Sequence, residues 1–499
     1  AFFHPVSDFI SYWRTSDHQL DKVIEVEGFQ AEQQWKRDFE EDDNSVVGQV
    51  REYFRNSKRE GRLPANGVHI DIRCLEYTSR PLHSYVSTIP SYIRSQLNCY
   101  HRLKSKFFPD TSKQVEILSN VNFTIEEGSM TLVIGSPGSG KSSLCKILAN
   151  QEVEGGVSGR IHFGGEILSK KDHSHRVGYV RDVDLHLAHL TVQETFEFAD
   201  ALLTPNSSSQ QRKEKVDMIM KILGLSHRAN TIVGDDLTRG VSGGERRRVS
   251  VGVELLKRCQ LLVMDEATTG LDSSTSLQIF QSLRVFADEV APVFATLKQP
   301  GSELFDLFDN IIVMHDGRIV YAGPREDMLD YFEDKGLSVN RNTNPADEVL
   351  SLVDKHGNDL NATTNTIPKP QSFDAAHPEG IQLRYKQFSR NWFVQFFWGV
   401  KRGAQLMKNN PTIAASRVVF SIIMALIIGS VFLQIGNNQA SIFGIEGSLF
   451  IVATFPAFQA LSSLPTVFST RPVFYYQRKN NYYHAIPMQF ADFVVSLPV

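Results

Sequence analysis

Cysteine is scarce in this chain, and its four cysteines form no recognisable pattern. They lie far apart in a sequence of 499 residues, at Cys74, Cys99, Cys145 and Cys259. Disulfide-stabilised domains carry many cysteines in a short chain, and zinc or redox sites carry them in closely spaced pairs. The spacing therefore excludes a disulfide scaffold and favours reduced thiols in a cytosolic setting.

The sequence also lacks an excess of positive charge. It has 52 lysine and arginine residues against 56 aspartate and glutamate residues, a formal net charge of -4. General nucleic-acid binders usually present a broad basic field, so we expect no nucleic-acid partner. A hydrophobic content of 41% and a charged content of 22% exclude a wholly disordered or fibrous chain.

Two long stretches near the C-terminus contain no charged residue at all. One lies between Arg417 and Glu446, and the other lies between Glu446 and Arg471. Each is longer than the ~20 residues that a helix needs to cross a bilayer, so we expect membrane spans within residues 413–499. The chain begins without Met and ends at Val499 inside a third apolar run, and we expect it to be part of a longer protein.

Positive charge is distributed unevenly around these expected spans. Arg417 precedes the first span and Arg471 follows the second, whereas the loop at residues 436–447 carries only Glu446. Cytoplasmic loops are usually the positively charged ones. We therefore expect an integral membrane protein whose large preceding domain is cytoplasmic.

Before the spans, the composition changes from segment to segment. Residues 1–62 are polar with mixed charge, which favours a solvated helical or partly disordered extension. Across residues 63–353 strand and helix patterns alternate, which predicts a mostly parallel α/β sheet. Residues 354–380 are rich in Asn, Thr, Pro and Asp and are predicted to form a linker. Residues 381–412 combine aromatic and basic side chains, as in a helix at a membrane surface, although an amphipathic helix packed on protein stays open.

Three strands are expected early in the α/β domain. Alternating apolar residues indicate a strand from residue 68, and apolar runs indicate strands at 115–125 and 130–134. Residues 77–112 have no clear period and contain several prolines, so we expect an inserted loop there.

The third expected strand leads directly into a glycine-rich loop. The loop and the start of the next helical run consist of Gly135, Ser136, Pro137, Gly138, Ser139, Gly140, Lys141, Ser142 and Ser143, a full match to the P-loop pattern. Glycines let successive backbone N–H groups surround phosphate oxygens, and the helix N-terminus adds partial positive charge. We predict that Lys141 reaches the β- and γ-phosphates of ATP and that Ser142 ligates Mg²⁺.

A second strand supplies carboxylates to the same site. Residues 261–264 are apolar and are followed directly by Asp265 and Glu266. Because α/β sheets bind ligands at the carboxyl ends of their strands, both side chains are expected near the P-loop. We predict that Asp265 holds Mg²⁺, mostly through water, and that Glu266 polarises a water molecule aimed at the γ-phosphate.

Between these motifs lies another candidate for anion binding. Ser242, Gly243, Gly244 and Glu245 open a helical run, and a helix N-terminus presents backbone N–H groups to anions. Alone, such a sequence is more often an ordinary turn or cap. Its position between the P-loop and Asp265 instead favours a second site for anion binding.

Together these motifs resemble the nucleotide-binding domain of ATP-binding cassette (ABC) transporters. Residues 242–245 are similar to the family's signature motif, and residues 270–272 are similar to its D-loop. The order of cassette and then spans resembles the G subfamily, and the long N-terminal extension most resembles its pleiotropic drug resistance type. The resemblance covers about residues 63–499.

The resemblance implies an α/β P-loop ATPase domain followed by an all-α transmembrane domain. The ATPase domain would have a parallel sheet core with antiparallel and helical subdomains. ATP and Mg²⁺ would bind between two cassettes, so the implied partner is a second cassette and membrane half, in the same longer chain or in a dimer. The implied function is ATP-driven export of lipophilic or amphipathic compounds, including drug efflux, across the plasma membrane.

Two residues depart from the family's pattern. Asp182 stands where the family has a Gln that contacts Mg²⁺ and the attacking water, and Lys298 stands where it has a switch His. A Lys neutralises phosphate charge, but it lacks the acceptor nitrogen of imidazole. We therefore expect ATP binding with slow or altered hydrolysis. The alternative to an exporter is a regulatory nucleotide-binding half that completes its partner's ATP site.

The adenine-binding residue is the least direct assignment. Family members stack the base on an aromatic residue of the first strand region, for which Tyr77 is the candidate. Packing within the sheet is the alternative role for this side chain.

Overall fold

The computed structural model describes most of the chain. The described residues are 46–60, 68–79, 115–357, 360, 388–432 and 442–496, apart from the single positions 152, 154, 169, 206, 258 and 463. The chain divides into two compact units. The sheet unit comprises Ser57–Asp182 and Cys259–Leu383, and the helical unit comprises Ala1–Asn56, Val183–Arg258 and Arg384–Val499.

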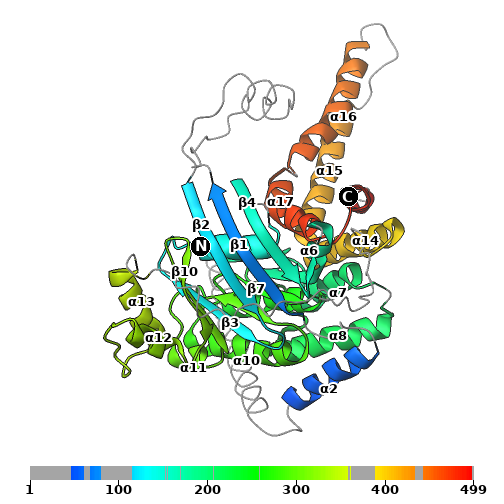
Figure 1. The fold of residues 1–499 in the computed structure, drawn as a ribbon. Helices are drawn as coiled ribbons and strands as arrows, with labels where there is room; N and C mark the ends of the chain where they lie inside the picture. Colours follow the sequence, from blue (N-terminus) through cyan, green and yellow to red (C-terminus); the bar gives the residue numbers. More distant parts are fainter. Residues whose placement is uncertain are drawn as a thin grey trace, which may run out of the picture. The chain divides into compact units, whose positions relative to one another are not determined.

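The larger sheet of the sheet unit has six strands in the order β10-β9-β3-β8-β7-β6 (Figure 1). They are β3 (Met130–Gly135), β6 (Val177–Val180), β7 (Leu261–Met264), β8 (Val293–Thr296), β9 (Asn310–His315) and β10 (Arg318–Pro324). All neighbours pair in parallel except β9 and β10, which pair antiparallel. Every residue of β3, β6, β7 and β8 is buried, as in parallel strands covered on both faces. The prediction of a mostly parallel sheet is confirmed.

The second sheet of this unit has four strands and is antiparallel throughout. Its order is β2-β1-β4-β5, with β1 (Ile70–Ser79), β2 (Val115–Ile125), β4 (Gly155–Phe163) and β5 (Glu166–Ile167). The expected strands at residues 68–72, 115–125 and 130–134 therefore correspond to β1, β2 and β3. Most of the expected loop at 77–112 lies outside the described residues.

One hydrophobic core joins the two sheets and supports the glycine-rich loop. Phe123 of β2 stacks on Phe294 of β8 with ring centroids 5.7 Å apart, and both rings are buried. Helix α5 (Lys141–Leu148) buries Leu144 and Leu148 in the same cluster. The loop before α5 is therefore held between a buried strand and a buried helix face.

Five further helices complete the described part of the sheet unit. They are α6 (Lys170–Arg176), α10 (Ser273–Glu289), α11 (Ser302–Phe305), α12 (Met328–Asp334) and α13 (Pro345–His356). Helix α13 extends past the start of the predicted linker at residues 354–380, most of which lies outside the described residues. No disulfide forms among Cys74, Cys145 and Cys259, which are the described cysteines.

The helical unit contains the elements that follow residue 183 and residue 384. The first group is α7 (Val192–Leu203), α8 (Ser209–Ile222), the short 3₁₀ helix η1 (Ser226–Arg228) and α9 (Gly243–Leu255). The second group is α14 (Trp392–Asn409), α15 (Pro411–Val431), α16 (Ile442–Ser462), α17 (Leu464–Lys479) and α18 (Ala485–Ser496). Helix α2 (Val46–Arg59) begins in this unit, and it is the described part of the predicted N-terminal extension.

Three helices of the first group begin with the same local signal. Thr191, Ser208 and Ser242 each form a capping box with the residue three positions later, which is Glu, Gln and Glu respectively. Each box satisfies two backbone N–H groups that the first turn leaves without helical partners. The sequence itself therefore defines where α7, α8 and α9 begin.

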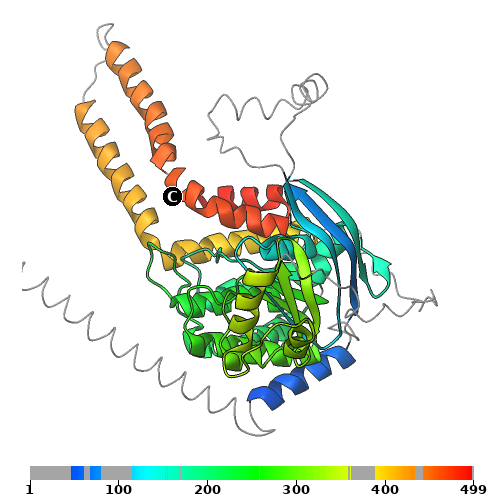
Figure 2. The ribbon, with the colours of Figure 1, turned by 60° about the vertical axis from the view of Figure 1, so that its left-hand side comes forward.

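Helices α14 and α18 lie side by side, as Figures 1 and 2 show. A Cβ atom at Gly399 would lie 2.7 Å from Ala491, and one at Gly403 would lie 2.8 Å from Val495. Glycine at both positions thus permits the close approach of the two helices. The helix expected within residues 381–412 is present as α14, and its contact with α18 covers one of its faces.

Helices α15 and α16 occupy the region of the two expected spans, but they do not follow the charge-free stretches. Arg417 lies inside α15, and Glu446 lies inside α16. Within the described residues, no helix is both long enough and apolar enough to cross a membrane.

The stacked pair of Phe123 and Phe294 yields a stability prediction. Phe294→Ala should lower the stability of the sheet unit by about 3–5 kcal/mol, because it removes a buried ring and leaves a cavity between the two sheets. Hydrogen exchange of the β3 and β8 amides measures this loss. Ile167→Ala removes an exposed side chain of β5 and should change the free energy of unfolding obtained from exchange by less than about 0.5 kcal/mol. Equal effects of both substitutions would contradict the role of the pair.

Candidate nucleotide-binding site

The glycine-rich loop connects β3 to α5 within the sheet unit. Gly138 and Gly140 have φ angles of 84° and 95°, in the left-handed region that disfavours residues with a Cβ atom. A Cβ at Gly140 would also lie 2.7 Å from the side chain of Leu118. Glycine at these positions is what allows the backbone to curl before α5 begins.

The ammonium group of Lys141 lies inside this curl. Its Nζ donates to the carbonyl oxygen of Gly135 at 2.5 Å, to that of Ser136 at 2.8 Å and to Ser139 Oγ at 3.2 Å. Burial lowers the pKa of Lys141, and the nearby carboxylates of Glu266 and Asp265 oppose that shift. The loop therefore concentrates a cation and backbone dipoles at the end of β3, as an anion site requires.

The carboxylate of Asp265 accepts hydrogen bonds from three side chains of the site. It follows β7 directly and is 1% exposed. Its Oδ1 accepts from Ser142 Oγ at 2.9 Å and from Thr296 Oγ1 at 3.2 Å, and its Oδ2 accepts from the Tyr179 hydroxyl at 3.3 Å. Burial raises the pKa of Asp265, while the hydrogen bonds from Ser142 and Thr296 lower it.

The structure thus brings together two of the residues predicted to hold Mg²⁺, Ser142 and Asp265. A hydroxyl and a carboxylate suit Mg²⁺, which takes oxygen ligands and usually completes its shell with water and substrate phosphates. Among the described residues, no cluster of three His, Cys, Asp or Glu side chains could hold a metal.

Glu266 is held in an unusual backbone conformation next to Asp265. Its φ angle of 48° is left-handed, and its N–H donates to Thr296 Oγ1 at 2.8 Å. Its Oε2 lies 2.8 Å from Lys298 Nζ and accepts from Thr269 Oγ1 at 3.3 Å. Strained conformations of this kind concentrate at functional sites, where surrounding contacts hold them. The side chain of Lys298 is 63% exposed, so the ion pair faces solvent.

Asp182 and Lys298 lie at the same edge of the sheet as Asp265. Asp182 follows β6, Lys298 follows β8, and both strands pair in parallel with β7. The charge of Asp182 is close enough to raise the pKa of Asp265. Its role as a metal ligand stays a prediction.

Tyr77 lies elsewhere, in the antiparallel sheet. It pairs with Leu118 of β2 and is 5% exposed within the core that joins the two sheets. This position provides the packing role that the sequence left open, and adenine stacking by Tyr77 stays a prediction.

Three residues of the site were not identified from the sequence. Thr296 and Tyr179 bond to Asp265, and the Ser136 hydroxyl donates to Asp354 of α13. Thr296 could have been found, because it ends β8 at the edge where the ligand-binding residues gather. Tyr179 and Asp354 carry no such signal, since strand order and helix docking decide their positions.

The second anion-binding candidate lies in the helical unit, at the start of α9. Ser242 Oγ accepts from the Glu245 N–H at 3.2 Å, and Glu245 Oε2 accepts from the Ser242 N–H at 2.8 Å. Burial opposes ionisation of Glu245, but hydrogen bonds from His227, the Ser242 N–H and Arg228 prevail and hold its pKa at about 2. Ser242 and Gly243 are exposed, and a Cβ at Gly243 would meet nothing within 4 Å. The start of α9 is therefore fixed by two reciprocal hydrogen bonds, and its first two residues are accessible to a ligand or partner.

Family models match both halves of the chain. Residues 118–269 match the model described as ABC transporter. Residues 394–499 and residues 298–371 match two models described as ABC-2 type transporter. The first match contains the P-loop, the start of α9 and the two carboxylates that follow β7.

Curated relatives carry names from one family. The chain is 34% identical to ABC transporter G family member 2 of Dictyostelium discoideum over 74% of this chain and 29% of that protein. It is 30% identical to G family member 22 of the same organism, over 76% of this chain and 65% of that protein. It is 28% identical to the broad substrate specificity ATP-binding cassette transporter ABCG2 of Sus scrofa, over 77% of this chain and 64% of that protein. The chain spans only 26% to 29% of the length of three Dictyostelium relatives.

The ion pair between Lys298 and Glu266 yields a prediction on turnover. Lys298→His should raise Mg-ATP turnover of the complete protein about tenfold, or ~1.4 kcal/mol of barrier, because imidazole can both donate and accept a hydrogen bond. Steady-state phosphate release measures the change. Lys355→His alters an exposed lysine of α13 and should leave turnover unchanged. Unchanged turnover in Lys298→His would mean that the site has adapted to lysine.

Proposed function

The chain belongs to the ABC transporter family, with relatives in its G family, and we propose that it is the cassette and the beginning of the membrane domain of an ATP-driven transporter. The observation that carries this proposal is the hydrogen bond of 2.9 Å between Ser142 and Asp265. It joins the helix after the glycine-rich loop to the strand that ends in Asp265 and Glu266. These are the two parts that a P-loop ATPase needs at one point.

Each residue of the site has a distinct proposed role. Lys141 and the loop N–H groups bind the phosphates, and Ser142 and Asp265 hold the metal end of the nucleotide. Mg²⁺, when bound, neutralises charge that develops on the phosphate oxygens during hydrolysis. Glu266 orients and deprotonates the attacking water, and Lys298 holds the Glu266 side chain at the edge of the sheet.

The proposed second half of each ATP site comes from another cassette. The start of α9, with Ser242, Gly243 and Gly244, would close over the nucleotide of a partner, in the same longer chain or in a dimer. Its support is the capping box of α9, which begins with the exposed residues Ser242 and Gly243. A helix N-terminus of this kind offers N–H groups and positive potential to a γ-phosphate.

Contacts inside the helical unit support transmission of cassette motion to the membrane helices. The Tyr476 hydroxyl of α17 donates to Glu254 Oε1 of α9 at 2.7 Å, and Glu254 is buried. Val473 of α17 packs in a small apolar cluster with Leu187 and Leu190, which lie just before α7. A movement of α9 or of the segment before α7 would therefore displace α17.

Helix α14 makes a second set of contacts with the same cassette helices. Lys401 Nζ lies 3.2 Å from Glu197 Oε2 of α7, and Asn409 donates to Glu194 Oε2 at 2.8 Å and to the His189 carbonyl at 2.9 Å. Glu194 also belongs to the capping box of α7. The N-terminus of α7 is thus bonded directly to the end of α14, where α15 begins.

The membrane placement of the C-terminal helices is also proposed. Large apolar side chains of α15 and α16 are exposed, among them Phe420, Leu426, Leu449 and Phe450. Lipid would cover this surface, with the cassette on the cytoplasmic side of the plasma membrane. We further propose that the transported compounds are lipophilic or amphipathic.

A regulatory nucleotide-binding half is the second candidate function. The ion pair of 2.8 Å between Lys298 and Glu266 favours this regulatory role. Glu266 is the proposed base, and the lysine paired with it can only donate protons and cannot accept one from it. In this case α9 would still complete the partner's ATP site, and the chemistry would occur at that other site.

Substitution of the proposed base separates the two functions. Glu266→Gln should reduce Mg-ATP turnover of the complete membrane protein at least 100-fold if this site performs the chemistry, because glutamine cannot accept the proton. Glu326→Gln removes a carboxylate whose side chain is 84% exposed and should leave turnover unchanged. Persistence of turnover in Glu266→Gln would reject the leading proposal and assign this cassette the regulatory role.

The Tyr476 contact makes a separate prediction about coupling. Tyr476→Phe should reduce transport several-fold while ATP turnover changes less than twofold, because a hydrogen bond to a charged group is worth ~1.5–3 kcal/mol. Substrate flux and phosphate release in the same proteoliposomes measure both. Tyr475→Phe changes the neighbouring, half-exposed tyrosine and should leave both rates intact. Parallel loss of flux in the two variants would contradict a specific coupling role.

A further inference from the structure

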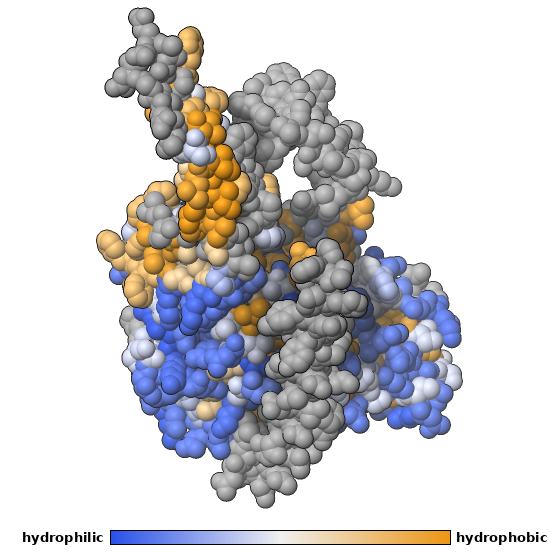
Figure 3. Space-filling model, turned by 180° about the vertical axis from the view of Figure 1, so that it is seen from behind, coloured by the Kyte–Doolittle hydropathy of each residue, from blue (hydrophilic) through white to orange (hydrophobic). Residues whose placement is uncertain are grey.

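Exposed aromatic side chains gather on the first part of α14. Trp392, Phe393 and Phe397 are exposed, and the Phe393 side chain is 77% exposed. Helix α18 continues this surface with exposed Phe490 and Phe493. In Figure 3, the apolar surface extends over the C-terminal helices. An exposed aromatic surface of this kind is suited to the boundary between headgroups and acyl chains.

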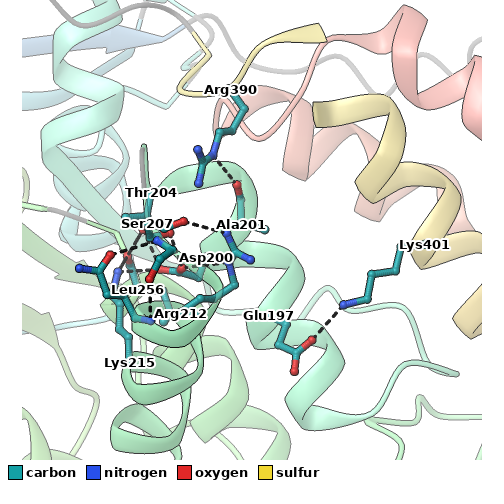
Figure 4. Close-up of polar contacts among 12 residues, drawn as sticks. Glu197, Asp200, Ala201, Thr204, Ser207, Arg212, Lys215, Leu256, Arg390 and Lys401 are labelled. Carbon is teal, nitrogen blue, oxygen red and sulfur yellow. Dashed lines mark hydrogen bonds and ion pairs between the residues drawn. The ribbon is translucent and has the colours of Figure 1, made fainter. Parts of the chain in front are cut away.

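A group of cations lies beside this surface, where α14 meets α7 and α8 (Figure 4). Asp200 of α7 is fully buried, with Lys215 Nζ at 2.8 Å and Arg212 Nε at 3.6 Å. Thr204 Oγ1 also donates to Asp200 at 2.7 Å. Lys215 additionally donates to the Leu256 carbonyl at 2.6 Å, so it is fixed in place. Arg212, by contrast, has a buried Nε without a hydrogen-bond partner.

Arg390 adds a third cation to the same group. Its Nε donates to the Ala201 carbonyl at 2.9 Å, as Figure 4 shows, and no carboxylate of the described residues lies within ion-pair distance of it. Burial lowers the pKa of Arg390, the like charge of Arg212 lowers it further, and Asp200 alone opposes the shift. Three cations therefore share one carboxylate, and an additional anion would relieve their repulsion.

The ring of Trp398 on α14 contacts two of the cations in this region. Lys401 Nζ lies 4.3 Å from the centroid of the Trp398 ring, and Arg212 lies 5.0 Å from it. Lys401 is paired with Glu197, so two carboxylates face four cations in this region. These four cations, Arg212, Lys215, Arg390 and Lys401, form the basic cluster.

We propose that the basic cluster binds the headgroup of an anionic phospholipid whose acyl chains lie along the exposed aromatic face of α14. The excess of cations over carboxylates supplies the charge complementarity. Arginine guanidinium groups are suited to phosphate and carboxylate groups.

A lipid is favoured over free phosphate because part of the basic cluster adjoins the exposed aromatic residues: Lys401 lies on α14 itself, and Arg390 lies two residues before it. Trp392 and Phe393 begin that helix. At its other end, α14 is followed at once by α15, the first of the proposed membrane helices. Free phosphate would use the cations but would leave the adjacent aromatic side chains without a partner.

This inference rests on the membrane placement proposed above. If α15 enters the bilayer, α14 lies at the level of the headgroups, where anionic lipids attract lysine and arginine at ~1 kcal/mol for each residue. The membrane placement itself is tested by carbonate extraction of the complete protein from membranes.

Lipid titration of the purified complete protein tests the proposal. Native mass spectrometry in mild detergent measures apparent affinities for phosphatidylserine and phosphatidylcholine. Arg390→Gln should weaken phosphatidylserine binding about fivefold and leave phosphatidylcholine binding unchanged. Lys213→Gln removes an exposed charge from α8 outside the basic cluster and should change neither affinity. Arg390→Lys retains the charge and should retain most of the selectivity, which controls for misfolding.

Three results would overturn the proposal. These are equal binding of the two lipids, undiminished phosphatidylserine binding by Arg390→Gln, and displacement of phosphatidylserine by millimolar inorganic phosphate in an Arg390-dependent manner. The last would identify free phosphate as the ligand. Release by carbonate would reject the membrane placement and the proposed transporter, whereas loss of lipid selectivity in a retained protein would reject this inference alone.

Discussion

The buried carboxylate of Asp265 is the interaction on which the nucleotide site depends. It accepts hydrogen bonds from the helix after the glycine-rich loop, from the end of β8 and from β6, through Ser142, Thr296 and Tyr179. A buried carboxylate without partners would be costly, so these bonds fix three neighbouring elements around one point. The same Thr296 hydroxyl accepts from the backbone of Glu266, which places the proposed base beside the proposed metal ligand.

Buried charge has a similar structural role in the helical unit. Asp200 and Glu254 are both fully buried, and each pairs with a lysine of the unit. Around Asp200 gather α7, α8 and the segment before α14, and Glu254 connects α9 to Tyr476 of α17. Since an unpaired buried charge costs several kcal/mol, these contacts resist separation of the cassette helices from the C-terminal helices. They are therefore suited to carry displacement from one group of helices to the other.

Much of the site was predictable because its motifs are local. The P-loop, the apolar strand ending in Asp265 and Glu266, and the capping box at Ser242 each depend on a few consecutive residues. The strands β1, β2 and β3 followed from apolar alternation and short apolar runs for the same reason. By contrast, the absence of charge does not specify where a helix begins, and α15 and α16 begin before Arg417 and Glu446 respectively.

The sequence by itself determined the residue types at the phosphate site and the family to which they point, since backbone curvature and phosphate binding need glycine and lysine at set positions. The resemblance also predicted that Lys298 stands where the family has a histidine. Only the tertiary structure decided that Lys298 pairs with Glu266, that Tyr179 and Thr296 hold Asp265, and that Arg390 joins Arg212 beside Asp200. These contacts join residues far apart in the chain, and their formation depends on strand order and helix docking, which no local pattern encodes.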